Sequence, residues 1–303
     1  MSQRERGRLW AIGIVVAGVW AMSACTSSLV LGTAYNAAAK KTADRLKTYA
    51  DFDQAQQQWI EQSFQSFQQW HRISELPGYS ALLTDVATTL RSEQPIPEQQ
   101  LDTWVNTVEE RSHRARSCSP LTGAAEFLTD MADWQVVQLQ KTLDTNRQKR
   151  YEEYKSETAE ERQERRREQM ITWASRAGIK FSDEQKQLLD STLAQQTSMG
   201  DRRFRLWEQW TAEFIDLLEQ RESNEFGSRL QSHVDSLWTI TEKNYPKEWK
   251  QNRDLWQGFA HTILNDLSVA QKTELAETIT SISESTLTLS RKKSRAEPVC
   301  YSG

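Results

Sequence analysis

One short segment gathers side chains that can move protons. His71 and Glu75 lie four residues apart, so an α-helix would place both on one face. An imidazole beside a carboxylate can transfer protons, or can bind a metal ion when a third ligand is present. Arg72 and Tyr79 add hydrogen-bonding groups, and Trp70 adds an aromatic surface. These five residues are the candidate functional cluster.

The same cluster also has a structural interpretation. His71 continues an apolar helical stripe that begins at Ile60. A histidine in such a stripe is commonly half-buried, with its polar nitrogen satisfied by Glu75 or by a backbone carbonyl. Arg72 and Tyr79 would then fix the angle between two helices that meet at a proline-glycine break. Binding of a partner is a third interpretation.

Other sequence signatures of catalysis are absent. The chain has no Gly-x-Ser-x-Gly elbow, no glycine-rich phosphate loop and no His-Glu-x-x-His motif. Its four histidines show no metal-ligand spacing with one another or with cysteine. We therefore predict a non-catalytic protein without a metal or a diffusible cofactor. An envelope hydrolase or metal-dependent enzyme centred on His71 and Glu75 is the alternative.

The first 25 residues have the pattern of an export signal. Three arginines precede a 16-residue run without charge, residues 9–24, which is shorter than the roughly 20 residues of a membrane-spanning helix. Small residues lie directly before Cys25, whose thiol can carry a diacylglycerol through a thioether. We predict that residues 1–24 are a signal peptide and that Cys25 becomes a lipidated N-terminus. An uncleaved anchor helix and ordinary cleavage are the alternatives.

The composition narrows the function class and the location. The net charge is −4, and loss of residues 1–24 makes it about −6, so the chain has no general attraction for nucleic acid. Eleven glycines and six prolines are few for 303 residues, which favours helices over sheets. Thr26, rather than an aspartate, follows Cys25, and the sorting rule of bacterial lipoproteins then favours the outer membrane. We expect a periplasm-facing protein with an envelope protein or peptidoglycan as its partner.

The remaining chain is expected to be one helical unit. Residues 25–34 are the predicted tether, residues 35–290 the all-helical domain, and residues 291–303 a basic flexible tail. The domain should be an elongated bundle of antiparallel hairpins, one of them long and charged, because residues 144–169 contain eight acidic and eight basic side chains. Cys118 and Cys300 can pair in an oxidising compartment, or can remain as two thiols.

Several helix starts and ends can be assigned. Helices are expected before the Leu76-Pro77-Gly78 break, from Tyr79 to Arg91, and along an unbroken stripe from Leu128 to Leu143. Three helix starts share a capping residue followed three positions later by glutamine. They are Asp53 with Gln56, Ser182 with Gln185, and Ser268 with Gln271. Thr158 with Glu161 is a related capping box. The pattern reflects either common capping chemistry or a duplicated helical hairpin.

Part of the chain resembles a known family. Tyr35-Asn36, Tyr49-Ala50-Asp51-Phe52 and the Trp70-His71-Arg72-x-x-Glu75-Leu76-Pro77-x-Tyr79 block are similar to a family of bacterial lipoproteins catalogued as a domain of unknown function. The resemblance implies an all-helical lipoprotein and carries over no catalytic residue. The glutamine helix starts are also weakly similar to the Leu-Thr-x-x-Gln motif of the small periplasmic Spy and CpxP chaperones, whose concave faces are basic whereas this chain is acidic.

The twelve tryptophans are the last notable feature. They either fill a helical core or line a groove for lipid, glycan or a partner peptide. A binding or chaperone-like module predicts an exposed apolar patch rimmed by charge. A catalytic module predicts His71 and Glu75 open to solvent and directed at one another. A spacer between membrane and peptidoglycan, with residues 144–169 as its arm, is a weaker third option.

Overall fold

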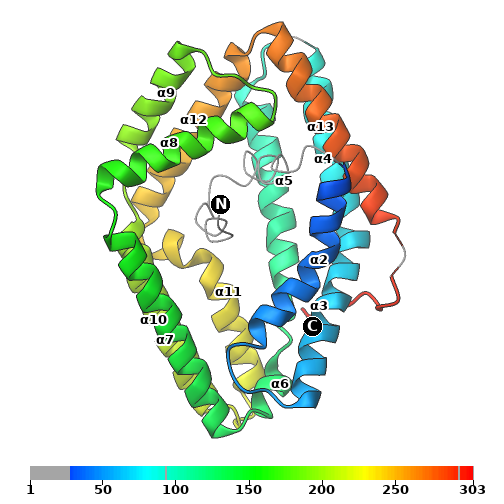
Figure 1. Ribbon diagram of the computed structural model, residues 1–303, viewed down its shortest axis with the longest axis vertical. Helices are drawn as coiled ribbons and strands as arrows, with labels where there is room; N and C mark the ends of the chain where they lie inside the picture. The colour runs from blue at the N-terminus through cyan, green and yellow to red at the C-terminus, as the bar shows by residue number, and fades with distance from the viewer. Residues whose placement is uncertain (1–27, 93, 293, 303) are drawn as a thin grey trace.

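The computed structural model describes residues 28–92, 94–292 and 294–302, so Cys25 and the predicted signal peptide lie outside the described residues. The described residues form twelve α-helices and no β-strand, which confirms the predicted all-helical class (Figure 1). No helix among them is both long and apolar enough to cross a membrane. The helices are α2 (Ser28–Leu46), α3 (Gln54–Ser74), α4 (Leu76–Arg91), α5 (Glu98–Ser117), α6 (Ala125–Thr129), α7 (Asp133–Lys155), α8 (Ala159–Arg176), α9 (Asp183–Gln195), α10 (Gly200–Glu219), α11 (Phe226–Asn244), α12 (Pro246–Asp266) and α13 (Val269–Ser290).

The capping boxes lie where the sequence predicts them. At the start of α3, Gln56 N–H donates to Asp53 Oδ1 at 2.8 Å, and Asp53 N–H donates to Gln56 Oε1 at 3.0 Å. The same reciprocal pair of bonds opens α8, α9 and α13. Each box satisfies two backbone N–H groups that a helix start otherwise leaves without a partner.

Two hydrophobic cores lie toward opposite ends of an elongated frame (Figure 1). The first core is formed by α4, α5, α8, α9, α12 and α13, and it encloses Trp104. The second is formed by α6, α7, α10 and α11, and it encloses Leu218 and Leu230. The chain crosses between them repeatedly, and a helix break marks each crossing, as at Glu75, residues 156–158, residues 196–199 and Tyr245.

The α4–α13 pair is the closest helix contact of the first core. Small side chains let the two backbones approach, with Ala87 and Ala276 fully buried in the same core. Ser80 Oγ lies 2.9 Å from Ser283 Oγ, and Ser283 Oγ donates to Ser80 O at 2.9 Å. Thr84 Oγ1 lies 3.0 Å from Ser283 Oγ, so the polar atoms of this seam satisfy one another.

The first helix begins earlier than expected. We predicted that residues 25–34 form a tether, but α2 begins at Ser28 and includes residues 28–34. Leu31 packs against the first core, and Gly32 faces Leu289 of α13. This apolar packing offsets the conformational entropy that is lost when the segment becomes ordered. The sequence pattern alone did not indicate the contact between α2 and the first core.

Two other helix boundaries differ from the prediction. The second helix starts at Leu76 rather than Tyr79, because a proline is tolerated in the first turn, where no N–H partner is needed. The stripe after Leu128 is divided, since α6 ends at Thr129 and α7 begins at Asp133. Gln135 Oε1 accepts from Ala132 N–H at 3.0 Å, so a glutamine opens α7 although its cap residue is an alanine without a side-chain acceptor.

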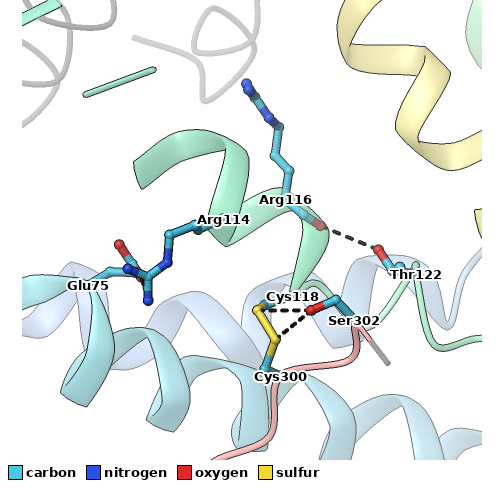
Figure 2. Close-up of a disulfide and its surroundings, with 7 residues drawn as sticks. All are labelled: Glu75, Arg114, Arg116, Cys118, Thr122, Cys300 and Ser302. Atoms are coloured by element: carbon cyan, nitrogen blue, oxygen red, sulfur yellow. Dashed lines mark hydrogen bonds and ion pairs between the residues drawn. A yellow bond between two sulfur atoms is a disulfide. The ribbon is translucent and has the colours of Figure 1, made fainter. Parts of the chain in front are cut away.

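The C-terminal segment is attached to the body. The structure joins Cys118 to Cys300 in a disulfide at the end of α5 (Figure 2). Val299 N–H donates to Ser66 O of α3, and Tyr301 N–H donates to Cys118 O, both at 3.2 Å. The far end of the segment predicted as a flexible tail therefore crosses from α3 to the α5–α6 loop.

We predict that this disulfide stabilises the fold. Closing a loop with a sequence separation of 182 contributes about 5 kcal/mol in the chain-entropy model. A reductant should therefore lower the Tm of the wild-type chain to that of the Cys118→Ser/Cys300→Ser variant, whose Tm should not respond to the reductant. Thermal unfolding followed by circular dichroism measures both. An unchanged wild-type Tm after complete reduction would contradict the prediction.

Candidate functional site

The candidate cluster lies at the break between α3 and α4. The backbone N–H of Glu75 donates to His71 O at 3.0 Å and closes α3, and α4 starts at the next residue. Trp70, His71 and Arg72 thus lie near the end of α3, and Tyr79 lies on the first turn of α4. The sequence block positions its five members around one helix joint.

Glu75 is the most deeply buried charged group of the cluster, with no exposed surface. Its Oε2 lies 3.3 Å from Arg111 Nη1, and its Oε1 lies 3.1 Å from Arg114 Nη2. Figure 2 shows Arg114 directed from the end of α5 toward Glu75. The Oε1 contact has an ion-pair distance without hydrogen-bond geometry. A buried carboxylate requires such cations, because its desolvation costs several kcal/mol.

Gly78 leaves the space through which Arg111 reaches Glu75. A Cβ atom at this position would lie 1.8 Å from Arg111 Cζ, far inside van der Waals contact. The glycine is in a regular helix, so a side chain is excluded by the guanidinium and not by backbone conformation. The glycine of the sequence block is therefore part of the ion-pair site.

The His71 side chain lies between tyrosine side chains. Its Nδ1 lies 3.0 Å from the Tyr35 hydroxyl, and its ring lies 6.0 Å from the Tyr79 ring between centroids. Burial lowers the pKa of His71 to about 4, so the imidazole is neutral at neutral pH. The side-chain partners of His71 and of Glu75 differ, and the structure does not pair the imidazole with the carboxylate.

Arg72 joins three helices. The side chain is buried, and its Nη2 donates to Asn36 Oδ1 of α2 at 3.0 Å. Its Nη1 donates to Leu289 O of α13 at 3.3 Å, and its guanidinium lies over the Tyr35 ring at 5.2 Å. Trp70 is half-buried and stacks on Phe67 of the same helix. These contacts hold α2, α3 and α13 together.

The arrangement suits the positioning of helices better than it suits proton transfer or metal binding. Among the described residues, no group of three His, Cys, Asp or Glu side chains is placed to hold a metal ion. Two surface depressions in this part of the chain lie along α7 and between α6 and the α10–α11 turn, and no residue of the cluster lines either of them. The imidazole is neutral, the carboxylate is ion-paired, and both are turned toward helix neighbours.

Sequence reasoning missed several members of the site. Arg111 and Arg114 supply the cations for Glu75, and Gln68 Nε2 donates to Tyr35 O. The only available signal was the basic end of the helix before Cys118. Spacing could not assign these partners, because they lie 33 to 39 positions away from the residues that they contact and on other helices.

We predict that Gly78→Ala displaces Arg111 and leaves the Glu75 charge undercompensated. The free energy of unfolding should fall by about 3–5 kcal/mol, the range for breaking a buried ion pair. Urea denaturation measures the change. Gly258→Ala on α12 is the matched control, because a Cβ there meets nothing within 4 Å, and it should stabilise by up to about 1 kcal/mol. Equal effects of the two substitutions would contradict the role of Gly78.

We also predict a pH dependence from His71. The unfolded chain binds a proton near pH 6.5, whereas the folded chain resists it until about pH 4. Unfolding therefore takes up a proton in this window, and stability should fall as the pH falls from 6.5 to 4, by at most about 3 kcal/mol. His71→Gln should flatten this part of the stability curve, measured by urea denaturation at each pH. Parallel curves for the two proteins would refute the assignment.

Comparison with known proteins places the chain in a family. A family model described as a family of unknown function, DUF6279, matches residues 48–245, which is more than half of the chain. The match contains the whole candidate cluster and begins after Cys25 and Tyr35. Neither the curated proteins nor the solved structures contain a match. The chain therefore belongs to the DUF6279 family of unknown function.

Proposed function

We propose that this protein is a lipid-anchored, non-catalytic binding module of the bacterial cell envelope. Cys25 carries the lipid, the helical domain faces the periplasm from the outer membrane, and an envelope protein is its partner. The support for the anchor is the sequence before Cys25. The support for a binding role is an exposed tryptophan, Trp134, with an exposed valine one turn away on the same helix.

The tryptophans divide into two groups. Of the ten in the described residues, eight are buried or half-buried and fill the helix contacts. Trp134 and Trp238 are exposed by 54% and 39%, and Arg116 lies over the Trp238 ring at 5.3 Å. Trp134 is therefore the aromatic side chain best placed to contact another molecule.

Trp134 has an exposed apolar neighbour and acidic surroundings. Val137, one turn along α7, is 63% exposed. Asp130 is exposed directly before α7. Asp51 is held beside α7 by a hydrogen bond in which Gln138 Nε2 donates to Asp51 Oδ2 at 2.8 Å. An apolar pair rimmed by carboxylates complements a segment that combines apolar with basic side chains. We take such a segment of an envelope protein as the partner.

The catalytic alternative receives less support. It requires His71 and Glu75 to be open to solvent and to face one another. The Glu75 carboxylate is instead buried against two arginines, and the His71 imidazole contacts Tyr35. A proton-transfer role would need both contacts to be released.

We expect a photo-crosslinking amino acid at Trp134, introduced into the full chain in bacterial cells, to capture a discrete envelope protein. The same amino acid at Gln140 is the matched control, since Gln140 is exposed on the same helix but faces another direction. Equal capture at both positions, or none at Trp134, would argue against this binding surface.

The anchor is tested on the same preparations by intact mass. The wild-type chain should begin at Cys25 and carry acyl chains, and the Cys118→Ser variant should retain them. Cys25→Ser should remove both the processing and the lipid, and with them the cross-link. A wild-type chain that starts at Met1, or that carries no lipid, would exclude the anchor while leaving the surface on α7 open to separate test.

A further inference from the structure

The helix α8 separates its charges onto two faces. All four of its glutamates are exposed, whereas its arginines toward the middle of the helix are half-buried. At 100° per residue, Arg162 and Arg166 lie on the side opposite to the glutamates. The same side continues into Trp173, which packs against the first core. The arginines therefore extend the inward face of the helix.

The flanking arginines are neutralised, and the inward ones are not. Arg165 Nη2 lies 2.6 Å from Glu157 Oε2, and Arg167 Nε lies 2.6 Å from Asp190 Oδ1. In the described part of the chain, no carboxylate lies within 4 Å of Arg162 or Arg166. Two guanidinium charges on the inward face thus have no ion-pair partner.

Their hydrogen bonds are to neutral groups. Arg162 Nη1 donates to Tyr154 O at 2.9 Å at the end of α7, and its guanidinium lies over the Tyr154 ring at 4.3 Å. Arg166 Nη1 donates to the amide oxygen of Gln196 at 2.9 Å. Arg162 has a structural role at a helix C-terminus, where a positive charge is favoured. Arg166 has only a neutral amide as its side-chain partner.

A third arginine approaches from α10. The first turn of α10 packs on Tyr154. A Cβ atom added at Gly200 would lie 2.2 Å from the Tyr154 hydroxyl, and the Phe204 ring lies 5.3 Å from the Tyr154 ring between centroids. Arg203 lies in this turn and has no carboxylate within 4 Å among the described residues. Part of its surface is exposed, although burial lowers its pKa. Burial lowers the pKa of Arg166, and repulsion from nearby arginines, Arg203 among them, lowers it further.

We propose that Arg166 and Arg203 bind a phosphate group, with Arg162 adding to the positive field. Guanidinium groups match phosphate oxygens in charge and in planar geometry, and a phosphate anion would neutralise cations that have no carboxylate partner. A lipid headgroup and a soluble phosphate share this chemistry. The site goes beyond the proposed function, because it needs neither the anchor nor the surface at Trp134.

The test is calorimetric titration of the full chain in detergent at low salt. One arm uses pyrophosphate, and the other uses micelles containing phosphatidylglycerol, with phosphatidylcholine micelles as the blank. Arg166→Gln and Arg203→Gln should each weaken binding by about tenfold or more. Arg205→Gln, an equal charge change at an exposed position of the same helix, should stay within about twofold. Tighter binding in one arm identifies the source of the phosphate and supports the site.

A second measurement separates binding from a structural role. In a buffer without phosphate, Arg203→Gln should raise the Tm by about 1–3 °C, because it relieves repulsion between like charges. A structural arginine would instead lower the Tm when it is replaced. The proposal is overturned if neither arm shows binding, if Arg205→Gln weakens binding as much as Arg203→Gln, or if Arg203→Gln lowers the Tm.

Discussion

A carboxylate without access to water constrains the middle of this molecule. Glu75 occupies the break between α3 and α4, and it is compatible with the fold only where cations reach it. Arg111 and Arg114 bring the end of α5 to the break, and Gly78 leaves room for one of them. The angle between α3 and α4 and the position of α5 are therefore consequences of one ion-pair site. Because the chain crosses between its two cores here, this site also sets how the cores are joined.

The glutamine helix starts connect distant parts of the chain in a reciprocal way. Gln185 Nε2 donates to Asp266 Oδ2, just before α13, and Gln271 Nε2 donates to Lys180 O, just before α9, both at 2.9 Å. Each glutamine uses its amide oxygen to cap its own helix and its amide nitrogen to bind the segment before the other. A glutamate could cap but could not donate. This reciprocity is what a duplicated helical hairpin would produce, whereas common capping chemistry would not require it.

Local patterns were readable from the sequence, and contacts between helices were not. The capping box at Ser182 was predicted correctly because its residues lie three positions apart and act on each other. The start of α7 was missed because Ala132 contributes only a backbone N–H to its box. The spacing of His71 and Glu75 indicated a shared helix face, yet their partners come from α2 and α5. Periodicity specifies which face turns inward, and it does not specify what that face meets.

The charges of residues 144–169 also show that a sequence pattern does not specify what a helix face contacts. Residues 144–169 contain equal numbers of acidic and basic groups, and by composition the segment has no net field. A helix nevertheless distributes residues by angle, so equal numbers can occupy different faces. In α8 the carboxylates face solvent, where water screens them, and Arg162 and Arg166 face the protein, where screening is weaker. A segment that is neutral in sequence is thus positive where a ligand or another helix would meet it. A summed charge therefore cannot exclude an anion site, because the local field depends on which residues share a face.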